Sequence, residues 1–496
     1  NSNVPDWVVL MPIGRSVFIA IAIVLIIVAG VAGYFAGTSV APTTTVTTTV
    51  TSTIAVTHTV TVTATTASPT PTPSPTASPT PTPPPGATII EMWDGLGGGD
   101  GWVMDQLINK FNQQYGSRYF IVRTMIGWGD LFPKLVTLAK AGEIGGMPHI
   151  VLHHEYEIPL LKDMVIVPVD DVMKQLGLSR DDFLSITVNK VTYDGKMYSI
   201  PWDQHTFALY FRTDLAKQYG IKIPPPACTT FGLQCWDKTL DTLDDFNEWL
   251  EKEVKPKLPS DVVPMAVSGF GWELYGWWPK NAVIGDGTDL KPKPEITAPY
   301  SIEVLKKLRY AVEAGLMTYQ VPWADLANCL AGGKVFSWIH GNWMMATYDI
   351  LPGGCPYGVA PVLKGTGGSW AASHVISITV RAAKDPKALE GVIEFFRFLY
   401  TAENNAYWGL NAGHVPAYKP AAEIYKRQGS PQKQMFYSQV FEFGIKYMPA
   451  HPLTHQINDI LGQYSWQAVV TGAISVEEAA KAMQDEIETL IATYIG

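Results

Sequence analysis

The stretch TIIEMWDGLGGGDGWVMDQLINKFNQQYGSRYFIVRTM, residues 88–125, contains the pattern that decides the fold. It begins with a short apolar run and a glycine-rich turn. Apolar residues then follow at helical spacing over 102–115, and a second apolar run occupies 119–125. The alternation continues with a helical pattern at 131–141 and an apolar run at 149–152. Strands that alternate with helices indicate β-α-β units and a parallel sheet. We therefore predict an α/β fold whose ligand site lies beyond the carboxyl ends of the strands.

The glycine-rich turn GLGGGDG at residues 95–101 does not predict a nucleotide site. It lacks the lysine of a phosphate-binding loop, and the carboxylate of Asp100 would repel a phosphate. The glycines favour a turn, or a close approach of the backbone to a ligand.

Charged residues are distributed unevenly along the 496-residue chain. It has 36 basic and 45 acidic side chains and a net charge of −9, yet none of these charges lies between Arg15 and Glu91. This split excludes a single uniform globular protein and a multi-pass membrane protein. The acidic balance gives no reason to expect a nucleic-acid partner, which would favour basic patches. The chain beyond Glu91 is too long for one ordinary core, so we expect two lobes.

The uncharged region has two parts that follow a short N-terminal segment, residues 1–15. Residues 16–37, SVFIAIAIVLIIVAGVAGYFAG, would span about 33 Å as a helix, enough to cross a bilayer. We predict a single transmembrane helix that anchors the protein in the cell membrane. The alternatives are a cleaved signal and a pilin-like helix that self-associates. Residues 38–86 are rich in Thr and Pro, which predicts an extended, O-glycosylated stalk holding the binding domain outside the cell.

Four cysteines agree with an extracellular location. Cys228 and Cys235 bracket a short loop, and Cys329 and Cys355 form the other candidate pair. Disulfides are typical of oxidising compartments, although the sequence alone allows three pairings. No C-x-x-C motif or local Cys/His cluster is present, so the sequence predicts no metal site and no cofactor.

Tryptophan and polar residues occur together where strands are expected to end. For any single tryptophan, core packing is the commoner explanation, but the repeated pairing favours a site. A pyranose stacks its C–H faces on aromatic rings, and its hydroxyls need carboxylates and amides in fixed directions. The predicted substrate-binding residues are Trp93, Asp94, Trp128, Asp130, His154, Glu155, Trp202, Asp203, Gln204, Glu273, Tyr275, Trp278, Asn342, Trp343, Trp370 and Trp408.

Five segments, in order along the chain, resemble the family 1 extracellular solute-binding proteins of ABC transporters, the maltose and multiple-sugar group. They are DGKMYSIPWDQHTFALYFRTDL (194–215), GGKVFSWIHGNWMM (332–345), SHVISITVRAAKDPKALEGVIEFFRFL (373–399), GHVPAYKPA (413–421) and GAISVEEAAKAMQDEI (472–487). Each motif is loose, but their order and spacing together are specific. With its expected anchor and stalk, the chain looks like an archaeal member of this group.

The resemblance implies a two-lobed fold of the periplasmic-binding-protein type II class, with a hinged cleft. Lobe 1 would comprise 87–203 and 376–412, and lobe 2 would comprise 204–375 and 413–496. The hinges would lie near residues 201–205, 374–378 and 413–416. The family's cleft residues would fall on Asp94, His154, Glu155, Asp203, Gln204, Glu273, Tyr275, Trp278 and Trp343. The pair His153-His154 departs from the maltose-type pattern.

The resemblance also implies a function. We expect a membrane-tethered extracellular protein that captures a carbohydrate, an oligosaccharide in particular, and delivers it to the permease subunits of an ABC importer. One alternative is a subunit of a surface filament that displays sugar-binding domains. A glycoside hydrolase is the other, because carboxylates in a tryptophan-lined cleft also describe such enzymes; we expect a binding protein and not an enzyme.

Overall fold

The computed structural model describes residues 82–267, 271–279, 282–285, 289, 291–319, 321 and 326–495. The predicted transmembrane helix and all but the last residues of the predicted stalk lie outside these residues. Within the described part of the chain, no helix has both the length and the apolar character needed to cross a membrane.

The first sheet contains five strands in the order β2-β1-β3-β13-β6. The strands β1, β2 and β3 are parallel, as the alternating pattern predicts, whereas β13 runs antiparallel to β3 and to β6. The antiparallel β13, which follows β3 by more than 200 residues in the chain, makes the sheet mixed. The strands are β1 (Thr88–Asp94), β2 (Tyr119–Met125), β3 (Ile150–His154), β6 (Ile200–Pro201) and β13 (His374–Ile378).

Helices pack on this sheet and share its core. The helix α2 contacts β2, and α16 contacts β1. Residues that precede and residues that follow the strands β7 to β12 (residues 203–372) therefore build one core. Asp385 caps the start of α16 by accepting from the backbone N–H groups of Lys387 and Ala388. The helices and small strands of this region are α2 (Gly99–Tyr115), α3 (Trp128–Ala141), α4 (Ile158–Leu161), α5 (Asp170–Leu176), α6 (Ser185–Val191), β4 (Thr192–Tyr193), β5 (Lys196–Met197), α15 (Val380–Ala383), α16 (Pro386–Leu399) and α17 (Ala402–Ala412).

The second sheet is organised around β7 (Asp203–Arg212). One end of β7 pairs with β12 and β14, and the other end pairs with β10 and β11. All but the last residue of β7 are buried, which fits a central strand covered on both faces. The path β15-β12-β7-β10-β8-β9 includes β8 (Val263–Ala266), β9 (Met317–Thr318), β10 (Val335–Gly341), β12 (Ser369–Ala372) and β15 (Ile445–Tyr447), with β11 (Tyr357–Ala360) and β14 (Val415–Pro416) beside β7.

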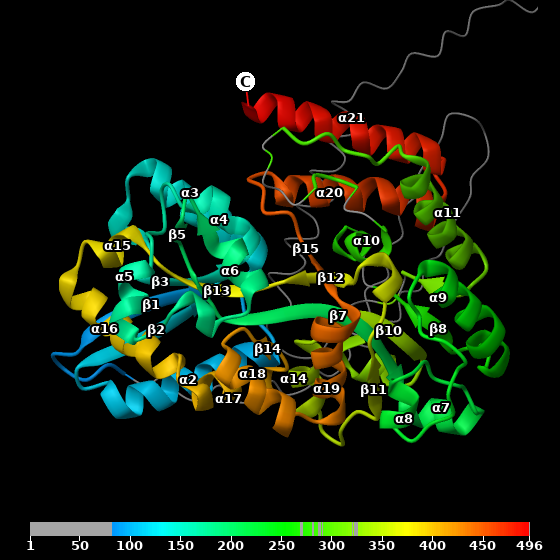
Figure 1. The fold of residues 1–496 in the computed structure, drawn as a ribbon, viewed down its shortest axis with the longest axis horizontal. Coiled ribbons are helices and arrows are strands. Elements are labelled where there is room, and N and C mark those ends of the chain that lie inside the picture. The colour runs from blue at the N-terminus through cyan, green and yellow to red at the C-terminus, as the bar shows by residue number, and fades with distance from the viewer. Residues whose placement is uncertain are drawn as a thin grey trace, which may run out of the picture. The chain divides into compact units, whose positions relative to one another are not determined.

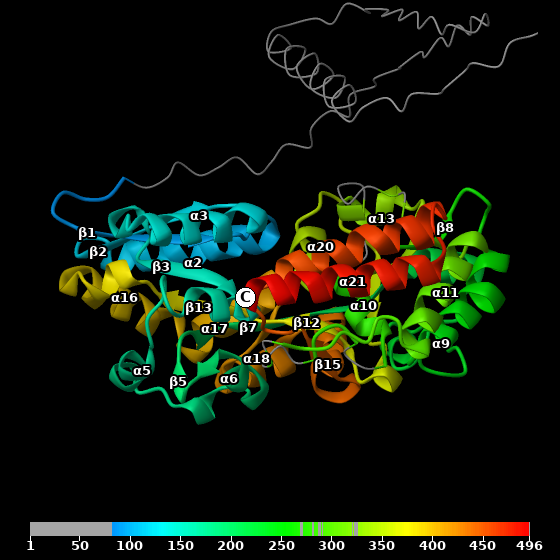
Figure 2. The same cartoon turned by 90° about the horizontal axis from the view of Figure 1, so that it is seen from above.

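A second hydrophobic core surrounds this sheet. Figures 1 and 2 show α20 and α21 side by side over this part of the molecule, and the two helices contact each other. The helices are α7 (Thr213–Tyr219), α8 (Ala227–Thr230), α9 (Leu243–Trp249), α10 (Trp272–Trp277), α11 (Pro299–Glu313), α13 (Cys329–Gly332), α14 (Met344–Asp349), α18 (Lys419–Gln428), α19 (Pro431–Ser438), α20 (Thr454–Ser465) and α21 (Val476–Ile495).

The chain passes between the two sheets at three points, which lie near the middle of the view in Figure 1. Trp202 separates β6 of the first sheet from β7 of the second, and Ser373 separates β12 of the second from β13 of the first. The third point is Gly413-His414, between α17 and β14. Gly413 has a φ of +90°, and a Cβ there would lie 2.4 Å from the carbonyl oxygen of Asn342, so only glycine fits this crossing.

Both candidate disulfides are present. Cys228 pairs with Cys235 and Cys329 pairs with Cys355, which selects one of the three pairings that the sequence allows. The first closes a short loop after α8, and the second ties the start of α13 to the segment before β11.

Candidate functional site

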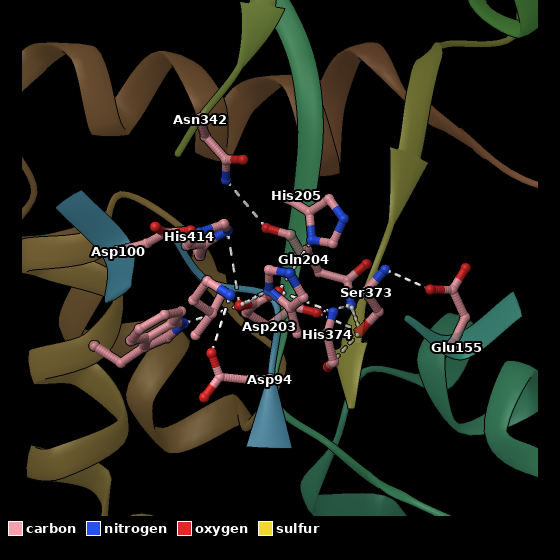
Figure 3. Close-up of polar contacts among 12 residues, drawn as sticks. Asp94, Asp100, Glu155, Asp203, Gln204, His205, Asn342, Ser373, His374 and His414 are labelled. Carbon is pink, nitrogen blue, oxygen red and sulfur yellow. Dashed lines mark hydrogen bonds and ion pairs between the residues drawn. The ribbon is translucent and has the colours of Figure 1, made fainter. Parts of the chain in front are cut away.

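Asp203 is the centre of a buried polar group at the crossings (Figure 3). Its Oδ2 atom lies 2.9 Å from Nδ1 of His374 and accepts from the indole N–H of Trp408 at 2.9 Å. Its Oδ1 atom accepts from the backbone N–H of His374 at 3.1 Å and lies 3.3 Å from Nδ1 of His205. Because side chains two apart on a strand share a face, β7 presents Asp203 and His205 to the same group.

His414 completes this group from the third crossing. Its Nδ1 atom lies 3.7 Å from Oδ2 of Asp203, and its Nε2 atom lies 3.7 Å from Oδ2 of Asp100 at the start of α2. The imidazole stacks on the indole of Trp408, with ring centres 5.2 Å apart and planes within 5°. Three separate chain crossings therefore bring imidazoles to one carboxylate.

Charge and burial oppose each other in this group. Burial alone would raise the pKa of Asp203, but the neighbouring His374 and His414 imidazoles and its hydrogen bonds hold that pKa well below its usual range. Burial lowers the pKa of His205 well below its ordinary value, and the charge of His374 acts in the same direction. Burial also acts against protonation of His374, yet the carboxylate of Asp203 raises its pKa. These directions favour an ionised Asp203 paired with a protonated His374, beside a neutral His205.

Two further carboxyl groups lie near the crossings. Asp94, at the end of β1, accepts two hydrogen bonds of 2.7 Å from the guanidinium of Arg123, which also pairs with Asp105. Glu155, directly after β3, accepts from the backbone N–H of Ser373 at 2.6 Å, while its other carboxyl oxygen is buried with no hydrogen-bond partner. Burial raises the pKa of Glu155 to about 8.

Amide groups connect the crossings on the second-sheet side. Asn342, which follows β10, donates to the carbonyl oxygen of Gln204 at 3.1 Å. The side chain of Gln204 donates to the carbonyl oxygen of Asp203, and the hydroxyl of Ser373 donates to that same carbonyl. Figure 3 shows these side chains converging around β7 from different elements.

Aromatic rings surround the polar group. Trp128 stacks on His374, with centres 5.4 Å apart and planes within 12°, and lies 4.3 Å from the ring of His154. Trp343 and Trp370 each lie 5.7 Å from His205. Trp128 and Trp343 are half-buried, so each presents part of its ring to solvent.

A second histidine cluster centres on Glu157 in η2 (Glu155–Glu157). The Glu157 carboxylate lies 3.3 Å from Nε2 of His455 on α20 and within 4 Å of Nδ1 of His153 and of His154. Burial opposes ionisation of Glu157, but its histidine hydrogen bonds hold the pKa far below its usual range. Burial also lowers the pKa of His154, to about 4. The contact between His455 and Glu157 therefore joins η2, which follows β3 of the first sheet, to α20, which packs in the second core.

The structure brings part of the predicted site together and separates the rest. Eleven predicted residues lie at or beside the crossings: Asp94, Trp128, His154, Glu155, Trp202, Asp203, Gln204, Asn342, Trp343, Trp370 and Trp408. Among these, the side chain of Trp202 is buried in the first core. Tyr275 and Trp278 are buried in the second core, away from the polar group. Trp93 packs under the ammonium of Lys134, and Asp130 is exposed in the first turn of α3. The side chain of Glu273, in α10, lies outside the described residues.

Sequence reasoning missed several residues of the site, chiefly histidines. His205, His374 and His414 were not among the predicted site residues, and neither were Asp100 and Ser373. A signal was present, because each of the three predicted hinges contains one of these histidines. Because the three histidines lie far apart along the chain, the sequence did not predict that they form one cluster.

Fold and site together define a two-lobed α/β binding protein. The chain belongs to the bacterial extracellular solute-binding protein family, whose model matches residues 106–434. Membership places it among solute-binding proteins and not among enzymes.

Relatives of known name support this assignment. The sn-glycerol-3-phosphate-binding periplasmic protein UgpB of Rhizobium meliloti is 22% identical over 363 residues, which is 70% of this chain and 79% of the relative. The solved structure of maltose-bound T. maritima MalE3 superposes with a TM-score of 0.64 at 20% identity, covering 81% of this chain and 99% of that one. UgpB of Mycobacterium tuberculosis in complex with glycerophosphocholine gives a TM-score of 0.64 at 16% identity, with 83% and 100% covered. At these identities the structural likeness concerns the fold.

Proposed function

We propose that this chain captures a carbohydrate, and an oligosaccharide in particular, at the crossings between its two lobes. The observation that carries the proposal is the meeting of half-buried indoles with buried carboxyl and amide groups. Trp128 and Trp343 provide faces for sugar rings, and Glu155 and Asn342 provide polar atoms beside them. The lobes would close on the ligand by a hinge motion, because contacts from both halves favour the closed form.

A neutral ligand suits this site better than a phosphate ester, the ligand named for the UgpB relatives. The His374 imidazole beside the site already pairs with the carboxylate of Asp203, so a phosphate would have to compete with that carboxylate for it. The guanidinium of Arg123 already pairs with two carboxylates, Asp94 and Asp105. A glycerophosphate would have to compete with both for this cation.

Calorimetric titration of the full chain tests the choice. Maltotriose and maltose are the carbohydrate probes, and sn-glycerol 3-phosphate and glycerophosphocholine are the phosphate probes. The proposal predicts saturable binding of at least one carbohydrate, and weaker or no binding of both phosphate esters. Tighter binding of a phosphate ester than of every sugar in a wider oligosaccharide panel would refute it.

We also propose how the protein is placed and organised. Residues 16–37 would anchor it in the membrane as a single helix, with the stalk 38–86 holding the binding lobes outside the cell beside an ABC permease. The lobes would comprise 87–203 with 376–412 and 204–375 with 413–496. Mass spectrometry of the native protein tests retention of the helix and glycosylation of the stalk. Negative-stain microscopy of native membranes tests the filament alternative. Fibres would support that alternative, and dispersed particles alone would count against it.

A further inference from the structure

Four buried side chains at the crossings have the composition of a metal site. Asp203, His205, His374 and His414 each offer one ligand atom, and these atoms all lie within 4.8 Å of one another. Asp203 and His205 come from β7, His374 from β13, and His414 from the segment between α17 and β14. Each of the three crossings between the sheets therefore contributes at least one member.

The hydrogen bonds of this group are incomplete. Nε2 of His205 and both ring nitrogens of His414 are buried with no hydrogen-bond partner, and the two ion-pair distances of His414 are 3.7 Å each. A neutral imidazole carries only one N–H, so its other nitrogen needs a donor or a cation. The nearest charged neighbours of His414 are Asp100 and Asp203, which are acceptors. Buried polar atoms are normally satisfied, and a bound cation would satisfy imidazole nitrogens and carboxylate at once.

The chemistry of the four side chains selects the class of metal. Imidazole nitrogen suits zinc and its transition-metal neighbours, whereas calcium and magnesium require oxygen ligands. Three histidines with one carboxylate form a four-ligand set, the number found in closed structural zinc sites. Ligand bonds of about 2.0–2.2 Å place tetrahedral ligand atoms roughly 3.4 Å apart, so small side-chain rotations would contract the group onto an ion.

Neighbouring residues would orient these ligands. Asp203 accepts from the indole N–H of Trp408, and Asp100 faces the second nitrogen of His414. Metal-bound histidines commonly donate their other ring N–H to a carboxylate, which holds the ring in place. The stacking of His414 on Trp408 restrains the same ring.

We propose that Asp203, His205, His374 and His414 bind one divalent transition-metal ion of the zinc class, which ties the three chain crossings together. The ion would hold the strands that leave each lobe at a common point and set the hinge about which the lobes move. This inference differs from the expectation of no metal site, which considered only residues close together in sequence. It does not depend on which solute the protein binds.

The test uses the full chain, stripped of metal with a chelator and titrated with Zn²⁺ and with Co²⁺. We expect one equivalent of either ion by calorimetry, and visible absorption bands typical of four-coordinate Co²⁺. His414→Gln removes a ligand without removing a hydrogen bond, and His205→Gln removes a second. Each variant should weaken the affinity for Zn²⁺ at least tenfold, while far-ultraviolet circular dichroism of the metal-free variants should match that of the metal-free parent.

A matched control separates this site from the other histidine cluster. His455→Gln alters the cluster at Glu157 and should leave the affinity and the Co²⁺ spectrum unchanged. No stoichiometric metal binding to the parent protein would overturn the proposal. So would unchanged affinity in both His414→Gln and His205→Gln, or loss of binding in His455→Gln alone.

Discussion

Glu155 shows what burial does to a single carboxyl group. It lies directly after a buried strand, and one of its oxygens has no hydrogen-bond partner, so ionisation is unfavourable and burial raises its pKa to about 8. With this pKa Glu155 is neutral near pH 7, although its hydrogen bond from the backbone N–H of Ser373 favours the ionised form.

The raised pKa of Glu155 predicts a pH-dependent stability. The folded protein binds this proton up to about pH 8, whereas the unfolded chain releases it near pH 4.5. The stability that neutral Glu155 allows is therefore fully present below pH 4.5. Between pH 4.5 and pH 8 the free energy of unfolding should fall, by up to about 1.4 kcal/mol per pH unit. Urea unfolding between pH 5 and 8 measures the slope. Glu155→Gln should flatten it, and an equal slope in the variant would contradict the assignment.

Two tryptophans predicted to bind substrate have different environments and should respond differently to truncation. Trp278 is fully buried in the second core, so Trp278→Ala should lower the free energy of unfolding by about 3–5 kcal/mol. Trp343 is half-buried beside His205, so Trp343→Ala should weaken sugar binding by about 1–3 kcal/mol with less loss of stability. Denaturant unfolding and calorimetry on both variants separate the two effects. Equal losses of stability would contradict the distinction.

At the scale of elements, β7 organises the molecule. Its first residues belong to the crossing group, and its later residues form the centre of the second sheet. One strand therefore supplies both the site and the core, so a shift in its register would move Asp203 and His205 away from their partners.

The two disulfides should contribute unequally to stability. They close loops with sequence separations of 7 and 26 residues, and the loop-entropy model assigns about 2.4 and about 3.5 kcal/mol to such loops. Replacing Cys329 and Cys355 by serine should therefore destabilise the protein more than replacing Cys228 and Cys235. Guanidinium unfolding of the two double variants gives the comparison. The reverse order would show that packing around the bonds outweighs chain entropy.

At the scale of the whole molecule, His455 and Glu157 join elements of the two cores. Burial lowers the pKa of His455, but the hydrogen bond and charge of Glu157, together with Asp459, raise it above its ordinary value. Protonation should therefore favour the arrangement in which α20 contacts η2.

This contact predicts a small pH effect. Its stabilisation is complete below about pH 6.5 and is lost as pH rises through the raised pKa of His455. The His455 side chain is 43% exposed, so solvent screening limits the effect to about 1 kcal/mol. Unfolding and small-angle scattering of the ligand-free protein at pH 6 and pH 8 should differ more in the parent than in His455→Gln. Identical pH responses would exclude the contact as a pH-sensitive link between the lobes.

Much of the fold follows from local pattern, and the site follows only in part. The strands at 88–94 and 119–125 were predictable from their apolar runs, and α2 and α3 each begin three residues before the predicted helical patterns. The antiparallel pairing of β13 was not predictable from its own residues, because its partners β3 and β6 lie far earlier in the chain. Asp203 and Trp408 were predicted as site residues because each belongs to a pairing of tryptophan with polar residues. His414 lies in a predicted hinge, but nothing in its own segment shows that it meets Asp203.

The sequence by itself determined the α/β class, the family resemblance, and the division between an uncharged N-terminal region and a tryptophan-rich remainder. The α/β class and the division of the chain depend on periodicity and composition, which are properties of neighbouring residues. The resemblance depends on motifs that follow one another in the order typical of the family. Only the tertiary structure decided which tryptophans pack in a core, which cysteines pair, and which histidines meet at Asp203. The histidine cluster depends on three chain crossings that bring residues 203, 374 and 414 within a few ångströms of one another. The spacing of these residues along the sequence does not determine such distances.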